Sequence, residues 1–299
     1  MSIKILTLNT AMLPDIWPVI SEPKRVQRAN KLIDLIYKEN YDIICLQEVF
    51  SEEIRGIFFN KLKTKFPFIV KKTGDDVLWI QDSGLFFASM FPFKGKPGNI
   101  IFSNNPIGSD GQSEKGFLFA KLVITNDILL YCFSTHLQSS VSNDDVRRYQ
   151  LREIRNKMLE LFLLRSPELK NENMYLMLFG DLNIIGKSPG DATTETEYDK
   201  MMDILSYPRD LFRKKNITSA GLTWNGTENT FIKKNDKEDK DKQRLDYAIA
   251  FDNVPTGRVD GPPNKIGKIE CLSCTVKKFK DDKGNDLSDH YGIETVINI

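Results

Sequence analysis

The chain has 299 residues, 40% of them hydrophobic, and its 42 Lys and Arg residues nearly balance its 41 Asp and Glu residues, giving a net charge of +1. A soluble globular protein of this length buries roughly three-quarters of its unfolded surface, enough for one large core or two small ones. The balanced charge excludes the basic excess of a dedicated nucleic-acid binder, while a local basic groove stays open. No apolar run reaches the ~20 residues of a membrane-spanning helix, and the first residues do not read as a secretory signal peptide.

Short apolar runs that are typical of β-strands recur along the chain, at residues 3–9, 41–50, 84–91, 116–124, 128–136, 174–183, 245–251 and 292–299. Between them, residues 26–36 and 151–162 carry apolar side chains three and four positions apart, which predicts two helices with one apolar face each. Several of the strand-like runs are apolar almost throughout, as expected of strands covered on both faces. The sequence therefore predicts an α/β protein, with one mixed sheet or two packed sheets under helices.

Two further segments carry predictions of their own. Residues 232–244, IKKNDKEDKDKQR, have mixed charge and are predicted to form a solvated loop. Cys45 and Cys132 lie in apolar runs and are predicted to be inert core thiols. Cys271 and Cys274 form a single C-x-x-C, for which zinc and a disulfide remain open, although two free thiols are favoured.

The chain contains only two histidines, and both lie at the ends of predicted strands. His136 ends the apolar run LLYCFSTH, and His290 belongs to a polar SDH triplet that precedes the last strand. A single histidine at the end of a buried strand is more often a structural residue than a functional one. Two of them among hydroxyls, amides and carboxylates favour convergence on one polar site.

Other polar residues end or begin the predicted strands. Any one of them could simply cap or turn the chain, but six clusters in comparable positions favour a shared site, because ligands of α/β proteins bind beyond strand ends. The residues are Asn9, Gln47, Glu48, His136, Asp181, Asn183, Asp246, Asp289 and His290.

The residue types limit the chemistry of such a site. The chain has no G-x-S-x-G elbow and no Walker loop, which argues against a covalent hydrolase and a nucleotide kinase. Carboxylate and amide oxygens suit a hard cation such as Mg²⁺, and two histidines can supply a general base and a general acid near neutral pH. Metal-assisted hydrolysis of a phosphate ester uses all of these groups.

Six motifs occur in an order that resembles the endonuclease/exonuclease/phosphatase superfamily, which includes DNase I, abasic-site endonucleases, inositol polyphosphate 5-phosphatases and neutral sphingomyelinases. The motifs are LTLNT, CLQEVF, STHLQ, FGDLN, RLDY and LSDHYGIE, and they span nearly the whole chain. The resemblance implies a single catalytic domain over residues 1–299. It also implies a four-layer α/β sandwich of the DNase I-like kind, in which two packed mixed β-sheets are flanked by helices.

The segments between these motifs are most similar to bacterial-type neutral sphingomyelinase C. They are NTAMLP (9–14), EVF (48–50), DSGLFFAS (82–89), EKGFLFAKL (114–122), THLQSS (135–140) and VRRYQLREI (146–154). The 5-phosphatases carry a Trp-Cys-Asp-Arg signature where this chain has QRLDY, which argues against that subfamily. RLDY also occurs in abasic-site endonucleases and does not discriminate.

For the metal, the resemblance implies that Glu48 is the principal Mg²⁺ ligand, with Asn9 beside it holding metal or phosphate and Asp289 supporting the same side. Mn²⁺ and Co²⁺ are expected substitutes. For the reaction, it implies in-line attack of water on the phosphorus of sphingomyelin, releasing ceramide and phosphocholine.

The resemblance also implies roles for five other residues. His290 would take the proton of the attacking water and Asp246 would orient its ring. Asp181 and Asn183 would position the water and the phosphate, and His136 would face the leaving oxygen or the developing negative charge.

One segment departs from the secreted bacterial enzymes, in which an aromatic-tipped β-hairpin shortly before the SDH motif enters the membrane interface. Residues 274–286, CTVKKFKDDKGND, hold only Phe279 among lysines. The lysines could contact anionic headgroups, each worth roughly 1 kcal/mol near such a surface, or the hairpin could simply be solvated.

Three functions follow from the sequence. A sphingomyelin phosphodiesterase is favoured, and it implies a monomer at a sphingomyelin-containing membrane surface with no stable nucleic-acid partner. A DNase I-like or abasic-site-type nuclease is disfavoured by the balanced charge, and a lipid-binding pseudoenzyme by the competent residue at every catalytic position. Family analogy predicts secretion, while a cytoplasmic location stays open because the chain shows no signal peptide.

Overall fold

The computed structural model describes residues 1–13, 24–72, 82–104, 108, 113–163, 173–191, 194–255 and 266–299. Its strands are β1 Ser2–Met12, β2 Ile43–Val49, β3 Phe68–Val70, β4 Phe86–Ser89, β5 Gly98–Ile101, β6 Gly116–Thr125, β7 Ile128–His136, β8 Met174–Asp181, β9 Arg209–Asp210, β10 Trp224–Asn225, β11 Lys242–Gln243, β12 Asp246–Phe251, β13 Glu270–Lys277 and β14 Gly292–Asn298. Its α-helices are α1 Arg25–Lys38, α2 Glu52–Leu62, α3 Asp144–Leu163, α4 Glu197–Ile204, α5 Leu211–Lys215 and α6 Thr230–Asn235.

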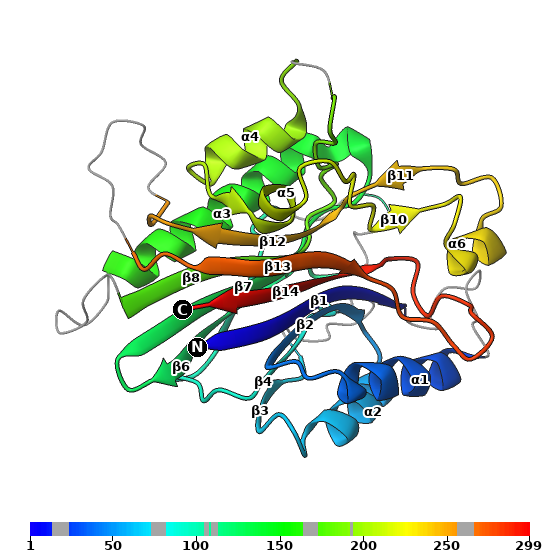
Figure 1. Cartoon of the computed structure of the whole chain (residues 1–299), viewed down its shortest axis with the longest axis horizontal. Helices are drawn as coiled ribbons and strands as arrows, with labels where there is room; N and C mark the ends of the chain where they lie inside the picture. The colour runs from blue at the N-terminus through cyan, green and yellow to red at the C-terminus, as the bar shows by residue number, and fades with distance from the viewer. Residues whose placement is uncertain are drawn as a thin grey trace.

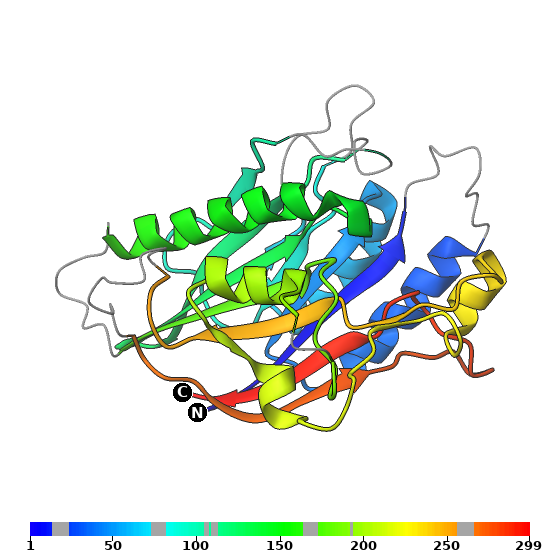
Figure 2. The same ribbon diagram turned by 90° about the horizontal axis from the view of Figure 1, so that it is seen from above.

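Two six-stranded sheets form the centre of the molecule (Figures 1 and 2). The first has the order β13-β14-β1-β2-β4-β3 and the second β5-β6-β7-β8-β12-β9, while β10 and β11 form a separate two-stranded sheet. In each large sheet one pair of neighbours is parallel, β1 with β2 and β7 with β8, and the other described pairs are antiparallel. Both sheets are therefore mixed, as the sequence predicts.

Apolar residues on both faces of the strands build three core layers. In β1, Ile3 and Ile5 face the layer between the sheets, whereas Leu6 and Leu8 pack under α1 and α2. The outer face of the second sheet packs under α3 and α4. Because strand side chains alternate between faces, strands covered twice must be apolar almost throughout. The four-layer sandwich confirms the predicted fold class (Figure 1).

Each predicted strand overlaps an observed one, and α1 and α3 cover the two predicted helices. The prediction for residues 232–244 was wrong at both ends of the segment. Asn229 caps α6 by accepting the backbone N–H groups of Phe231 and Ile232, and Ile232 is buried, while β11 pairs with β10. Residues 233–241 between them are mostly exposed, as expected.

The four cysteines are all buried and none of them forms a disulfide, so a Cys271–Cys274 disulfide is not observed. Both belong to β13, and the Sγ atom of Cys274 lies 3.4 Å from the Oγ1 atom of Thr295. The pair packs in the core layer between the two sheets.

Replacing Cys271 and Cys274 together by Ser is expected to leave kcat largely unchanged. Each buried hydroxyl that lacks a full partner costs about 1–3 kcal/mol, so the change appears in the melting temperature instead. Thermal unfolding and turnover measured side by side separate the two effects. A large loss of kcat in a folded variant would assign the pair to function.

Strand direction gathers the predicted site residues at one edge. The carboxyl ends of β1, β2, β7 and β8 lie there together with the amino ends of β12 and β14, because the latter strands run antiparallel to their neighbours. The chain termini lie side by side at the opposite end, where the Met1 amino group donates to the Ile299 carbonyl (Figures 1 and 2). No helix in the described part of the chain is both long and apolar enough to cross a membrane.

Candidate active site

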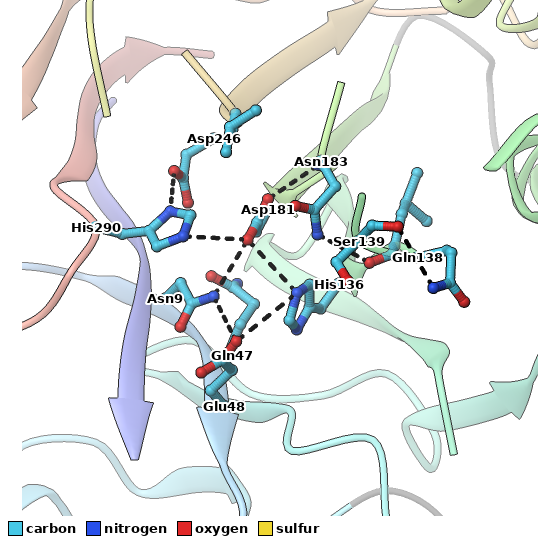
Figure 3. Close-up of polar contacts among 12 residues, drawn as sticks. Asn9, Gln47, Glu48, His136, Gln138, Ser139, Asp181, Asn183, Asp246 and His290 are labelled. Carbon is cyan, nitrogen blue, oxygen red and sulfur yellow. Dashed lines mark hydrogen bonds and ion pairs between the residues drawn. The ribbon is translucent and has the colours of Figure 1, made fainter. Parts of the chain in front are cut away.

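Side chains from both sheets converge in one polar cluster at this edge (Figure 3). The Asn9 amide at the end of β1 donates to Glu48 Oε1 over 3.0 Å and to Asp181 Oδ2 over 3.1 Å. Glu48 comes from the first sheet and Asp181 from the second, so the amide links the two sheets at the centre of the cluster.

The backbone is strained at three residues in or next to this cluster. Ala11, Glu48 and Asn183 have φ values of 52°, 56° and 51°, a left-handed conformation that costs a residue other than glycine roughly 1–3 kcal/mol. Such conformations persist only where the surrounding structure holds them. In β2 the left-handed residue is Glu48 itself, so the backbone conformation at this position determines the direction in which its carboxylate points.

His290 and Asp246 meet across the gap between the sheets. The Nδ1 atom of His290 lies 2.8 Å from Asp246 Oδ2, and its Nε2 atom lies 3.6 Å from Asp181 Oδ2. Burial lowers the pKa of His290, but the charges of Asp246 and Asp181 and the hydrogen bond to Asp246 outweigh burial and raise the pKa well above its ordinary value. The ring of Trp224 packs edge-on against the imidazole, with centroids 5.1 Å apart.

His136 faces the same carboxylates from the end of β7. Its Nε2 atom lies 3.5 Å from Asp181 Oδ2 and 3.9 Å from Glu48 Oε1. Burial, together with the positive charges of Lys115 and His290, lowers its pKa well below the ordinary value. His136 is therefore neutral at pH 7 and can donate one hydrogen bond without carrying charge.

Hydrogen bonds from Arg147 of α3 and from Asn183 hold the loop that follows His136. Arg147 donates to the Gln138 and Ser140 carbonyls and pairs with Glu197. The Asn183 amide donates to the Leu137 carbonyl over 3.0 Å, so it holds this loop as well as lying beside Asp181.

Asp289 lies at the rim of the cluster, half-buried, with Ser288 Oγ at 3.3 Å from its Oδ1 atom. Its negative charge still reaches the centre, because it contributes to the raised pKa values of Glu48 and His290.

The donor set fits a hard divalent cation. Burial and the charge of Asp289 raise the pKa of Glu48 to about 7, and burial raises that of Asp181 to about 6, with Asp246 adding to the shift. Ligand atoms of Asp181, Asp246 and His290 also lie within 4.8 Å of one another. Buried carboxyl groups that hold protons near neutral pH are groups from which a cation can displace the proton, and oxygen donors without thiolates match Mg²⁺.

Mg²⁺ binding is therefore expected to tighten as the pH rises from 6 to 8 and to release protons. The Glu48 carboxylate binds the cation only when it is ionised, and its pKa of about 7 places this ionisation in the range. The neighbouring Asp181, with a pKa of about 6, gains its negative charge over the lower part of the same range. Titration calorimetry in buffers of different ionisation enthalpy counts the protons. An affinity that is flat with pH would place the cation elsewhere.

The sequence reasoning missed one charged neighbour of the site. Lys115, which directly precedes β6, is buried and donates to the Leu137 carbonyl over 3.1 Å. Its positive charge lowers the pKa of both Glu48 and His136. The available signal was a lysine directly before a predicted strand, in the segment EKGFLFAKL (114–122) that resembles sphingomyelinase C.

Comparison with known proteins gives matches along nearly the whole chain. Residues 6–290 match the model of the Endonuclease/Exonuclease/phosphatase family. Sphingomyelinase C of Bacillus cereus is 26% identical over 322 residues, covering 100% of this chain and 89% of the relative.

Two solved structures share the fold. A mutant of beta toxin from Staphylococcus aureus with bound magnesium ions has a TM-score of 0.67 and 19% identity over 99% of both chains. TDP2 of D. rerio, complexed with a single-strand DNA product, has a TM-score of 0.69 and 17% identity over 100% of this chain and 99% of that one. Since the family model spans nearly the whole sequence, the chain belongs to the endonuclease/exonuclease/phosphatase family.

Proposed function

We propose that the protein is a Mg²⁺-dependent phosphodiesterase that hydrolyses sphingomyelin to ceramide and phosphocholine. The observation that supports the reaction class is the buried imidazole of His290, which is held by Asp246 and faces the Asp181, Asn9 and Glu48 cluster. The substrate is proposed from the similarity to sphingomyelinase C over the whole chain.

In this proposal Glu48 and Asn9 hold the cation and Asp289 supports the same side. When bound, Mg²⁺ polarises the phosphoryl oxygens and offsets charge in the transition state. Mn²⁺ and Co²⁺ would substitute for it. Asp289, which supports the cation in this proposal, is one of the carboxylates that raise the pKa of His290, so a positive charge beside it would favour the neutral ring that a base requires.

The neutral His290 ring takes a proton from water, whose oxygen forms a new bond to phosphorus as the bond to the ceramide oxygen breaks. Asp246 keeps the remaining ring proton on Nδ1 and stabilises the imidazolium. Asp181 and Asn183 position the water and the phosphate, and the neutral His136 donates toward the oxygen that gains charge. The ceramide oxygen leaves with a proton from solvent or from the imidazolium.

The decisive experiment measures phosphocholine release from sphingomyelin vesicles with and without Mg²⁺, beside a plasmid-nicking assay. We expect release that depends on Mg²⁺ and no nicking. Nicking without phosphocholine release would favour the nuclease alternative. This alternative is tested because TDP2, which shares the fold, has been solved in complex with a single-strand DNA product. Neither activity in a folded protein would favour the binding pseudoenzyme.

The proposed partner is a sphingomyelin-containing membrane approached by a monomer, with no stable nucleic-acid partner, and the analogy with sphingomyelinase C extends the proposal to a secreted protein. The segment after β13 offers little for docking through an aromatic tip, because Phe279 is 7% exposed and packs against the core under α1. Its lysines are partly neutralised, since Lys278 pairs with Glu228 and Lys280 with Asp286. Docking therefore requires other surfaces.

A further inference from the structure

The hydrogen-bonded pair of His290 and Asp246, called the dyad from here on, joins the two sheets. Strand pairing within either sheet does not set the distance between these two side chains. Asp246 begins β12 in the second sheet, and His290 lies shortly before β14 in the first, separated from it by Tyr291. Strand pairing sets distances within a sheet, whereas the 2.8 Å contact between these two side chains crosses from one sheet to the other. Contacts outside the strand pairing therefore have to hold the two strand ends at this distance.

The segment Thr223–Asn229, which contains β10, lies against both sides of the dyad. Thr223 Oγ1 accepts the backbone N–H of Asp246 over 3.2 Å, and the Thr223 carbonyl accepts the N–H of Tyr291 over 2.8 Å. Trp224 forms a backbone bridge with His290 and places its ring against the imidazole. One end of the segment thus contacts the backbone on both sides of the gap.

Asn229 closes the other end of this segment. Its Nδ2 atom donates to the Ser288 and Asp289 carbonyls, each over 2.9 Å, and these are the two residues directly before His290. Its Oδ1 atom accepts the N–H groups of Phe231 and Ile232 at the start of α6. The side chain is fully buried, so its four hydrogen bonds are not in competition with water.

We propose that Asn229 is a positioning residue, which ties the backbone before His290 to the Thr223–Asn229 segment and thereby sets the distance between His290 and Asp246. Two functions of its amide can be separated. The oxygen caps α6, which serves stability, and the nitrogen holds the Ser288–Asp289 backbone, which serves the dyad. The kinetic consequence rests on the proposed role of His290 as a base, but the structural claim does not.

Two variants remove the donor and keep the cap. In Asn229→Ser the hydroxyl can still accept from the first turn of α6, but it is too short to reach both carbonyls. Asn229→Asp keeps the size and the acceptor, and loses the N–H donors when ionised. Asn216→Ser is the matched control, because the Asn216 amide also donates to two carbonyls, of Phe212 and Cys274, which lie outside the polar cluster.

The first measurement is the NMR signal of the His290 Nδ1 proton in the metal-free protein. With only two histidines in the chain, each imidazole can be assigned from a single His136→Gln sample. We expect the low-field signal of the hydrogen bond to Asp246 in the native protein, and its loss or upfield shift in both Asn229 variants. The His136 signals, and all signals in Asn216→Ser, should stay in place.

The second measurement is kinetic. The Asn229 variants should lose about 10- to 100-fold in kcat with little change in KM, as is typical when a group that orients an active residue is removed. In a His290→Ala background the same substitution should cost almost nothing more, because nothing is left to position.

An unchanged His290 signal in a folded variant would overturn the proposal, and so would a loss of kcat that persists in the His290→Ala background. Failure of both variants to fold would assign Asn229 to stability alone and also overturn it. If the native protein does not cleave sphingomyelin, the NMR comparison still decides the structural claim, so that the two proposals fail separately.

Discussion

Replacing Glu48 by Gln is expected to abolish Mg²⁺-stimulated activity in a protein that stays folded. The substitution keeps the size of the side chain and an oxygen that can accept from the Asn9 amide, but it removes the charge that binds the cation. Removing a group that orients a ligand already costs 10- to 100-fold, so losing a principal ligand should cost roughly 10²-fold or more. Turnover at saturating Mg²⁺ measures the loss.

The fold should tolerate this change because the metal-free site disfavours the ionised carboxylate. The pKa of Glu48 is raised to about 7, so its ionised form is less stable in the folded protein than in the unfolded chain, where the pKa is about 4.5. The folded native protein therefore loses stability as the pH rises from about 5 to 8 without metal, and the Gln variant avoids that loss. Thermal unfolding in chelator should show a growing advantage of the variant over this range.

Glu53→Gln is the matched control, since Glu53 is exposed in the first turn of the neighbouring α2 and its substitution removes the same charge outside the cluster. It should keep both activity and the Mg²⁺ response. Near-native turnover of Glu48→Gln at saturating Mg²⁺ would contradict the assignment of Glu48 as the metal ligand.

The sequence was sufficient to predict the strand ends because each one combines a local apolar run with an abrupt polar residue. His136 at the end of β7 and Asp181 at the end of β8 are examples, and their side chains meet because the two strands are parallel neighbours in register. The sequence also indicated that the sheets are covered on both faces, since a strand such as β1 carries apolar side chains on both of its faces. Such signals lie within ten residues or so and require no knowledge of tertiary contacts.

Other elements were missed although their signals were present. Ser51 caps α2, with Glu52 and Glu53 in the first turn, and Thr196 and Asp199 form a capping box at the start of α4. Both patterns favour a helix start and could have been read from the sequence. The strands β9, β10 and β11 have two residues each, too few for any periodicity to appear.

The supporting residues of the site could not be read in this way. Asn229 acts on carbonyls 59 and 60 positions further along the chain, and Thr223 on a backbone N–H 23 positions away. Contacts between a side chain and a distant backbone leave no pattern in a single sequence, because the backbone group is the same whatever residue carries it. They become visible only when the fold brings the segments together.

The dyad carries the second large prediction. His290→Ala should lower kcat by at least the ~10²- to 10⁴-fold typical of losing general base catalysis, while adding Asp246→Ala to it should cost little more. Asp246 fixes the tautomer and stabilises the imidazolium, so without the ring it has nothing to orient. A double-mutant cycle in kcat at saturating Mg²⁺, with folding checked by circular dichroism, measures the coupling.

The competing explanation is that Asp246 only stabilises the start of β12, in which case the two losses would multiply. The contacts of its carboxylate argue against this, since Oδ2 bonds to His290 and Oδ1 has no hydrogen-bond partner in the described part of the chain. A carboxylate that capped its own strand would accept backbone N–H groups, whereas here the Asp246 N–H itself is bound by Thr223. Asp252→Ala supplies the control, because Asp252 follows the other end of β12 and pairs with Arg209. Asp252→Ala should lower the stability of the protein, and any loss of kcat that it causes should multiply with the loss in His290→Ala. The dyad is accepted only if the losses of Asp246→Ala and His290→Ala do not multiply.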